Sequence, residues 1–365
     1  MSSKEVRVGI AGVGSCASSL VQLVEYVKSG SELSKTGIMF DSIGGYKAED
    51  IKFVCSFDVS DTKVGLDLSE AIFAYPNSAK KHVEVPYLNV KVHAGPLADG
   101  LDGILSTKIN PHRDSELATI DDVTEILKKT KTDVLVCYLP TGAKQAVENY
   151  AIAAANANVA FINCTPELVI RNEKLNSLFK EKKIPLLGDD MRSHMGATTL
   201  HTALIELLSS RGITVNNTYQ LNFGGNMDFF NLSDPSRNLS KQISKKNALY
   251  AAGIDASTVA AGPNGYVEYL QDNKVCYLRI EGSSILGSNI TMETRLEVED
   301  SPNSAGVIIT AVRIAKTALD NKEFGEVIEK TCPFLFKSPV KGMTESEALS
   351  AIKDYVASKE VVFND

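Results

Sequence analysis

The stretch that decides the fold is residues 6–28, VRVGIAGVGSCASSLVQLVEYVK. It begins with a short β-branched run that ends in glycine, and its second half spaces apolar residues on one helical face. Between the two halves, residues 12–17 match the pattern G-x-G-x-x-A. Glycines there allow a tight turn and a close approach of the backbone, and free N–H groups at the helix start can hold a pyrophosphate. The stretch predicts a strand, a turn and a helix that bind a dinucleotide.

A carboxylate at the end of the second strand indicates which dinucleotide. IKFVCSF, residues 51–57, is followed by Asp58, where a carboxylate accepts from ribose hydroxyls and repels a 2′-phosphate. The spacing from Gly12 is more than twice the roughly 20 residues of the compact fingerprint, and the loop of residues 29–50 accounts for the excess. We expect NAD and not NADP. The residues predicted to bind it are Gly12, Gly14, Ser15, Cys16, Ala17 and Asp58, with Pro140, Thr141 and Gly142 at the end of a later strand.

Apolar strands alternate with helices through the first half of the chain. The runs DVLVCYL, VAFINC and IPLLGDD, residues 133–139, 159–164 and 184–190, are typical of buried strands in a parallel sheet with both faces covered. After about residue 195 a helix is followed by longer, alternating strands, and helices return from Ser304, with breaks at Pro333 and Pro339. We expect an α/β protein. Residues 1–194 plus 302–365 form a doubly wound, Rossmann-like NAD-binding domain, and residues 195–301 form an inserted α+β catalytic and oligomerisation domain with a largely antiparallel sheet.

Composition excludes several classes of protein. The net charge is −7, from 38 lysines and arginines against 45 acids, which argues against a general nucleic-acid binder. No apolar run approaches the roughly 20 residues of a membrane helix, and the first residues are too polar for a secretory signal. The six cysteines show no C-x-x-C spacing and are expected to be buried free thiols in a cytoplasmic protein.

A basic cluster stands out in this acidic chain. Lys241 and Lys245 are four residues apart, so on a helix they share a face and repel by about 0.2 to 0.5 kcal/mol unless an anion lies between them. A solvated basic face is the alternative. The segments NFGGNMD, residues 222–228, and GDDMRS, residues 188–193, each end a strand with polar groups, where binding sites are commonly built.

Long segments of the chain resemble the myo-inositol-1-phosphate synthase family, in its shorter archaeal and bacterial form. They are GVGSCASSLVQ, GGYKAEDIKFVCSFDVSDTKVG, GDDMRSHMGAT, LNFGGNMDFFNL and EDSPNSAGVI, with SKQISKKNA and FLFKSP similar to the lysine-bearing segments. Three positions depart from the family pattern: Ser15 stands where asparagine is expected, and Arg192 and His194 stand where lysine and glutamine are expected.

The resemblance implies an enzyme of inositol and phospholipid biosynthesis that converts D-glucose 6-phosphate to 1D-myo-inositol 3-phosphate, with NAD used catalytically. It also implies a homotetramer. The steps are oxidation at C5, enolisation, aldol closure between C6 and C1, and reduction. Enolisation and closure need cations that face developing oxyanions.

The same resemblance implies roles for individual residues. The catalytic residues are Lys241, Lys245, Lys274, Lys337, Asp190 and Asp228, with Asp190 expected to pair with Lys337. The substrate phosphate is expected on Ser193, Asn226 and Lys245, and the nicotinamide end of the cofactor on Asp300 and Ser301. A divalent or monovalent cation could use the oxygens of Asp190, Asp300 and Ser301.

Two alternatives stay open on the sequence. A conventional NAD-dependent sugar or amino-acid dehydrogenase would share the N-terminal half of this argument and form net NADH. A non-catalytic NAD-binding regulator would need only the Rossmann-like half, and converging lysines would have no purpose in it.

Overall fold

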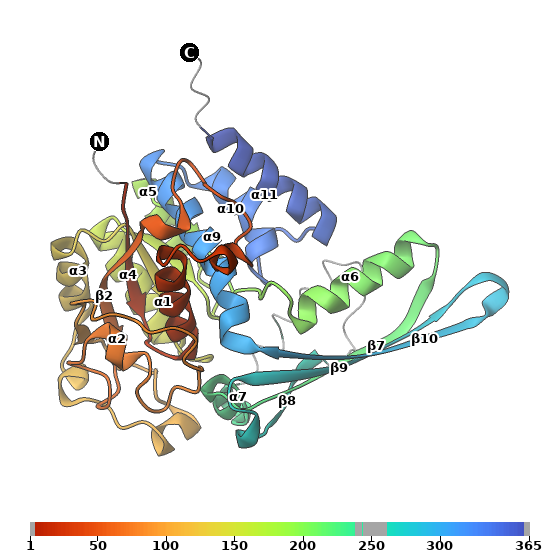
Figure 1. Cartoon of the computed structure of the whole chain (residues 1–365), viewed down its shortest axis with the longest axis horizontal. Coiled ribbons are helices and arrows are strands. Elements are labelled where there is room, and N and C mark those ends of the chain that lie inside the picture. Colours follow the sequence, from red (N-terminus) through yellow and green to blue (C-terminus); the bar gives the residue numbers. More distant parts are fainter. Residues whose placement is uncertain (1–3, 238–242, 244–260, 361–365) are drawn as a thin grey trace, which may run out of the picture.

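The computed structural model describes residues 4–237, 243 and 261–360. The larger part of the molecule is built around a six-stranded parallel sheet (Figure 1). Its strands are β1 (Val6–Ala11), β2 (Ile51–Asp58), β3 (Val92–Ala94), β4 (Val134–Cys137), β5 (Ala160–Asn163) and β6 (Leu186–Leu187). They lie in the order β3-β2-β1-β4-β5-β6. This is the strand order of a dinucleotide-binding doubly wound fold, so the predicted fold class is confirmed. The chain reverses its direction of winding between β1 and β4, and a ligand site is expected there.

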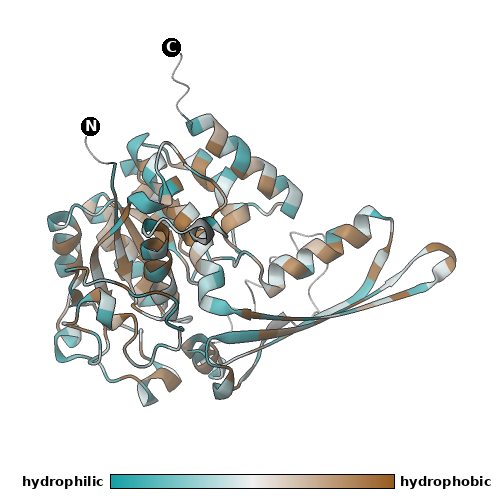
Figure 2. Cartoon of the chain, viewed as in Figure 1, coloured by the Kyte–Doolittle hydropathy of each residue, from teal (hydrophilic) through white to brown (hydrophobic). Residues whose placement is uncertain are grey.

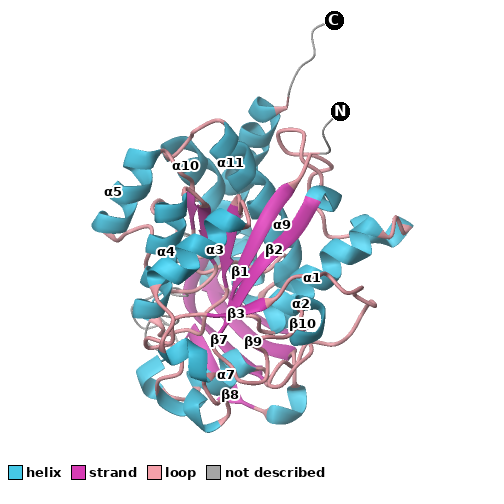
Figure 3. Ribbon diagram, turned by 90° about the vertical axis from the view of Figure 1, so that its left-hand side faces the viewer, coloured by secondary structure: helices cyan, strands magenta, loops and turns pink. Residues whose placement is uncertain are grey.

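Helices cover both faces of this sheet (Figure 3). On one face α4 (Lys144–Ala157) packs on β4 and β5 and contacts α3 (Ile120–Lys129) and α5 (Glu173–Lys182). On the other face α9 (Asp300–Asp320) contacts β1, β4, β5 and β6 and packs against α1 (Ser15–Lys28). Because α9 follows the second sheet in the chain, residues after the insertion complete the core of the first sheet. Strands β1, β4, β5 and β6 are buried along nearly their whole length, which explains their continuous apolar sequences.

The second sheet lies within residues 195–301 and extends away from the first (Figure 1). Its strands are β7 (Thr214–Gly224), β8 (Ala261–Tyr266), β9 (Asn273–Ser283) and β10 (Asn289–Glu299), in the order β10-β9-β7-β8. β9 pairs antiparallel with both β7 and β10, whereas β8 pairs parallel with β7. The prediction of a largely antiparallel sheet is therefore confirmed, with β8 as the exception. The domain boundaries themselves stay a prediction.

One face of the second sheet is covered by α6 (Ala197–Ser210), through contacts of Ile205 and Leu208 with Leu278 and Ile280. Along β10 exposure alternates residue by residue, and Figure 2 shows hydrophilic and hydrophobic residues mixed along the extended strands of this sheet. α7 (Met227–Leu232) follows β7 directly and lies near the carboxyl edge of the first sheet.

The C-terminal helices correct one detail of the sequence prediction. Pro333 was expected to break a helix, but it lies inside α10 (Gly325–Leu335), which ends only two residues later. In the last turn proline removes a single backbone hydrogen bond, and the helix ends before more are lost. Pro339 does fall between α10 and α11 (Glu345–Lys359), and Thr344 caps α11 with a capping box. Among the described residues, no helix has the length and apolar character needed to cross a bilayer.

Candidate functional site

The turn between β1 and α1 requires glycine at its first position. Gly12 has φ +88°, and a Cβ there would lie 2.9 Å from the carbonyl oxygen of Tyr138. Gly14 is the N-cap of α1, and a Cβ at Gly14 would meet no atom of the described residues within 4 Å. The first turn of α1 carries no acidic side chain. Its N–H groups and the positive end of the helix dipole therefore suit an anionic ligand, as predicted from the motif.

Asp58 fastens this turn to the second strand. Its Oδ2 accepts from the backbone N–H of Val13 at 2.7 Å, and its Oδ1 accepts from the N–H groups of Val59 and Ser60 at 2.8 and 2.9 Å. The carboxylate also lines the cavity described below. Its contact with the cofactor ribose stays a prediction, and the structure adds a second role in holding the turn.

Two residues that the sequence did not single out, Lys63 and Asn77, hold the same turn through the backbone of Val13. Lys63 is 4% exposed and donates to the carbonyl of Val13 and to Oδ1 of Asn77, both at 2.8 Å. Asn77 in turn donates to the carbonyl of Val13 at 3.0 Å. Burial lowers the pKa of Lys63, and Asp58 opposes that shift. No sequence signal marks Lys63, because its partners lie far away along the chain.

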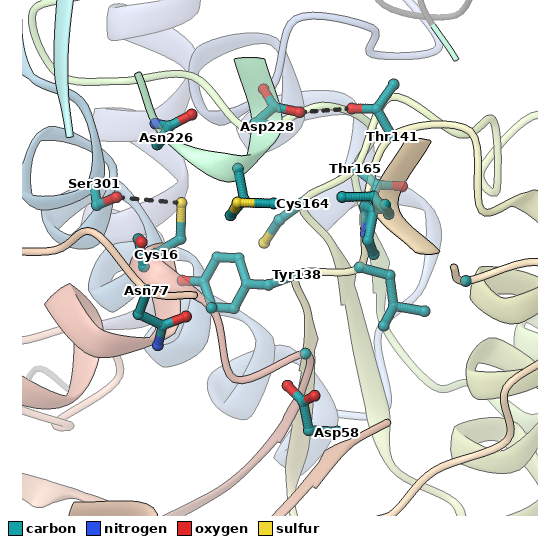
Figure 4. A pocket seen from close by; sticks show the side chains of 18 of the residues that line it. Cys16, Asp58, Asn77, Tyr138, Thr141, Cys164, Thr165, Asn226, Asp228 and Ser301 are labelled. Atoms are coloured by element: carbon teal, nitrogen blue, oxygen red, sulfur yellow. Dashed lines mark hydrogen bonds between the residues drawn. The ribbon is translucent and has the colours of Figure 1, made fainter. Parts of the chain in front are cut away.

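A single cavity runs from this turn to the second sheet (Figure 4). Most of the residues predicted for the site line it: Gly12, Gly14, Ser15, Cys16, Asp58, Pro140, Thr141, Asp190, Ser193, Asn226, Asp228, Lys274, Asp300, Ser301 and Lys337. We call it the main cavity. Two predicted residues do not line it. Ala17 is packed in the core beneath α1, and Gly142 donates its N–H to Glu167 at 2.8 Å. Lys241 and Lys245 lie outside the described residues.

Two lysines of the main cavity are each paired with a carboxylate. Nζ of Lys337 lies 2.9 Å from Oδ1 of Asp190, whose side chain is fully buried, so the predicted pairing is confirmed. Nζ of Lys274 lies 2.8 Å from Oδ1 of Asp300 and stands over the ring of Phe229. These pairs hold both ammonium groups at the cavity wall.

Behind Lys274 lies a second buried carboxylate, Asp272, which the sequence did not indicate. It accepts from Oγ of Ser301 at 2.7 Å and from the backbone N–H of Ser301 at 3.2 Å. Nδ2 of Asn226 lies 3.5 Å from Asp272 and 3.3 Å from Asp300. Burial raises the pKa of Asp272 to about 6, and the charge of Asp300 adds to the shift. Ser301 and Asn226 thus orient this pair of carboxylates.

The predicted cation finds little support in this geometry. Asp190 and Asp300 face lysines, and within residues 4–237, 243 and 261–360 no group of three or more His, Cys, Asp or Glu side chains is placed to hold a metal ion. A cation site stays a prediction.

Contacts between Thr141 and α7 link the loop that follows β4 of the first sheet to the helix that follows β7 of the second sheet. The hydroxyl of Thr141 donates to Asp228 at 3.0 Å, as drawn in Figure 4, and Asn231 donates to the carbonyl of Thr141 at 2.8 Å. Asn226 caps α7 by accepting from the N–H of Phe229. The loop after β4 and helix α7 are therefore held together at the cavity.

Tyr138 is a further residue that the sequence did not indicate. It lines the main cavity between Asn77 and Cys164 (Figure 4). Its hydroxyl is buried without a hydrogen-bond partner among the described residues. Burial raises its pKa well above the usual value, so the group is a neutral donor. A buried donor without an acceptor costs free energy that a ligand can recover.

A smaller side cavity adjoins the main one and shares Ser193, Asp228, Lys274 and Lys337 with it. It is also lined by Arg192, by Gly196, Thr198 and Thr199 at the start of α6, and by Gln220 and Asn222 of β7. Its wall carries the cations Arg192, Lys274 and Lys337 against the single acid Asp228. The carboxylate partners of these cations, Asp190, Asp300 and Glu345, do not line the side cavity, so its cationic lining and the helix start suit an anion. His194 lines neither cavity; its ring is packed against Gly306 of α9.

Comparison with known proteins gives one consistent family. The profile of myo-inositol-1-phosphate synthase matches residues 196–301. The chain is 41% identical to the inositol-3-phosphate synthase of Mycolicibacterium smegmatis over 360 residues, which is 96% of this chain and 98% of that protein. The crystal structure of Ari2 has 36% identity and a TM-score of 0.78, covering 98% of this chain and 100% of the other. A myo-inositol-1-phosphate synthase-related protein from Thermotoga maritima has 26% identity and a TM-score of 0.82, covering 97% and 98%.

Proposed function

The chain belongs to the myo-inositol-1-phosphate synthase family, and on that premise we propose that it converts D-glucose 6-phosphate to 1D-myo-inositol 3-phosphate, with NAD used catalytically and no net NADH formed. The observation that carries the proposal is the meeting of a dinucleotide-binding turn and two carboxylate-paired lysines in one cavity. A non-catalytic NAD-binding regulator would have no purpose for these lysines, and net NADH formation separates a dehydrogenase from the synthase.

The residues around the glycine turn fit NAD. The start of α1 would hold the pyrophosphate, and Asp58 stands where an adenosine ribose would lie. Tyr138, Cys16 and Ser301 line the same cavity, and Ser301 directly follows Asp300, the partner of Lys274. When bound there, NAD would supply the hydride acceptor and donor that the redox chemistry at C5 of the sugar needs.

The lysines of this chain account for the remaining chemistry. Lys274 and Lys337 carry positive charge at the point where the two cavities meet. Held by Asp300 and Asp190, they would face the sugar oxygens that become negative during enolisation and closure. Cations fixed before the reaction stabilise such oxyanions without a cost of reorganisation. We assign Lys337 to the C1 oxygen and Lys274 to the C5 oxygen. We keep Lys241 as a catalytic residue and Lys245 as a catalytic and phosphate-binding residue, as the resemblance implies.

The side cavity suits the phosphate group. Ser193 lines both cavities, so it can reach a phosphate in the side cavity, whereas Asn226 lines only the main one. Asn226 is also occupied with Asp272, Asp300 and the cap of α7. We therefore place the phosphate on Ser193 and the start of α6. We assign Asn226 to the orientation of the carboxylates of Asp272 and Asp300.

The test is a product assay with matched variants. The purified chain is incubated with NAD and glucose 6-phosphate, and inositol phosphate and NADH are both measured. Inositol phosphate without net NADH supports the proposal, net NADH points to a dehydrogenase, and neither product points to a regulator. Lys274→Ala should abolish product formation. Lys330→Ala is the control, because that lysine pairs with Glu326 on the exposed side of α10.

We also propose that the chain assembles as a homotetramer. The supporting observation is the second sheet, which extends from the body and ends in an exposed apolar turn at Ile285 and Leu286. Light scattering of the purified chain tests this, and a monomer in solution would contradict it.

A further inference from the structure

Arg192 occupies an unusual place beside the side cavity. Its backbone N–H donates to the carbonyl of Leu335 at 2.9 Å, which fixes the segment after β6. Its side chain is buried, with 7% of the residue exposed, and it lines the side cavity. A buried guanidinium cannot lose its charge, so this position needs negative partners.

One partner comes from the last helix. Nη1 of Arg192 donates to Oε1 of Glu345, the first residue of α11. The same oxygen accepts from the hydroxyl of Thr202 on α6 at 3.1 Å, and the N–H of Glu345 donates to Glu206 at 2.8 Å. Two residues of α6 thus hold the start of α11, Thr202 through the carboxylate of Glu345 and Glu206 through its backbone N–H, and the carboxylate holds one edge of the guanidinium.

The other edge of the Arg192 guanidinium, which carries Nε, makes no such contact. Nε of Arg192 is buried and has no hydrogen-bond partner among the described residues. A buried N–H without an acceptor costs free energy. Because Arg192 lines the side cavity, an anion that enters this cavity can supply the acceptor.

We propose that Arg192 determines specificity for a phosphate monoester, with Glu345 as the positioning residue that holds its guanidinium toward the side cavity. This rests on the proposed function and names a residue where the family pattern has lysine. A guanidinium binds a carboxylate on one edge and phosphate oxygens on another in a fixed plane. A lysine is a single point charge and cannot hold both partners in that geometry.

The test compares three variants of the full chain. Arg192→Lys keeps the charge and removes the planar fork, and Glu345→Gln weakens the anchor from outside both cavities. Arg171→Lys is the matched control, because Arg171 is an exposed arginine that donates to the carbonyl of Pro339. For Arg192→Lys we expect the KM for glucose 6-phosphate to rise about tenfold or more, with kcat changed less than about threefold, as for loss of uniform binding. Glu345→Gln should raise KM by a smaller factor in the same direction.

A second readout does not depend on turnover. Calorimetry with inorganic phosphate and the NAD-loaded chain should show weaker binding for Arg192→Lys than for wild type, with unchanged NAD affinity. If the wild type binds phosphate but forms no inositol phosphate, the proposed function fails while this arm still tests Arg192. Equal phosphate affinity and equal KM in a folded Arg192→Lys variant would overturn the inference.

A third measurement covers a variant that fails to fold. In a crystal structure of the wild-type chain with NAD and glucose 6-phosphate, a phosphate oxygen within about 3.2 Å of a guanidinium nitrogen of Arg192 supports the inference. A phosphate bound elsewhere, with Arg192 contacting Glu345 alone, overturns it and leaves the pair a link between helices.

Discussion

The pair of Lys337 and Asp190 should stabilise the fold and also serve the reaction, and the two effects can be separated. The Asp190 side chain is fully buried and that of Lys337 is 14% exposed. Removing one partner of a buried pair typically costs about 3–5 kcal/mol, because the other charge is left without compensation. Since Lys337 keeps some contact with solvent, we expect Lys337→Met to lower the free energy of unfolding by the lower value, about 3 kcal/mol.

Removing both charges should restore most of that loss. In the double variant Asp190→Asn/Lys337→Met both charges of the pair are replaced together, so we expect it to unfold within about 1 kcal/mol of the wild type. Turnover should not return, because the cation facing the substrate is absent; both variants should lose kcat by about 100-fold or more.

Urea denaturation followed by circular dichroism measures the first effect, and inositol phosphate formation measures the second. Lys330→Met is the control, because its exposed pair with Glu326 should contribute less than about 1 kcal/mol. A single variant as stable as the wild type would refute the argument from burial. A double variant that regains turnover would show that Lys337 serves only to neutralise Asp190.

Three further predictions concern the cofactor side of the cavity. Gly12→Ala should destabilise the chain, because Gly12 has a positive φ and a Cβ there would meet the backbone of Tyr138. Gly14→Ala should leave the stability unchanged and weaken NAD binding. Thermal unfolding measures the stability and calorimetry the NAD affinity, and equal stability of the two variants would contradict the steric argument. Tyr138→Phe should leave the NAD-free chain as stable as before and raise the Kd for NAD by about 3- to 10-fold, which fluorescence titration checks; an unaltered Kd would remove the hydroxyl from the cofactor site. The pKa of Asp272 is about 6 in the folded chain and near 3.8 in the unfolded chain. Between pH 3.8 and about 6 the unfolded state therefore binds fewer protons than the folded state, and the free energy of unfolding should fall as the pH rises across this range. Asp272→Asn should flatten that fall in urea midpoints measured across this range, and an identical pH profile would show that Asp272 titrates normally.

Local patterns in the sequence were sufficient for the fold and for much of the site. The β1 to α1 turn was predictable because the glycine spacing, the apolar strand and the helical face are all contained in residues 6–28. Lys274 and Lys337 came from the resemblance to a family, and the cavity that they share confirms that the chain brings them together. Pro333 was misread because a proline near the end of a helix removes too little hydrogen bonding to stop it earlier.

Tertiary structure alone decided which residues support the site. Lys63, Asp272 and Tyr138 carry no local pattern, and each acquires its role from atoms that the fold brings close, such as the carbonyl of Val13 for Lys63 and Ser301 for Asp272. Arg192 is a further residue whose contacts the sequence could not predict. The sequence marks it only as a departure from the expected lysine, whereas its anchor, Glu345, is set by the packing of α11 against α6. Burial and charge pairing depend on distances between elements remote in the chain, and those distances are properties of the folded molecule.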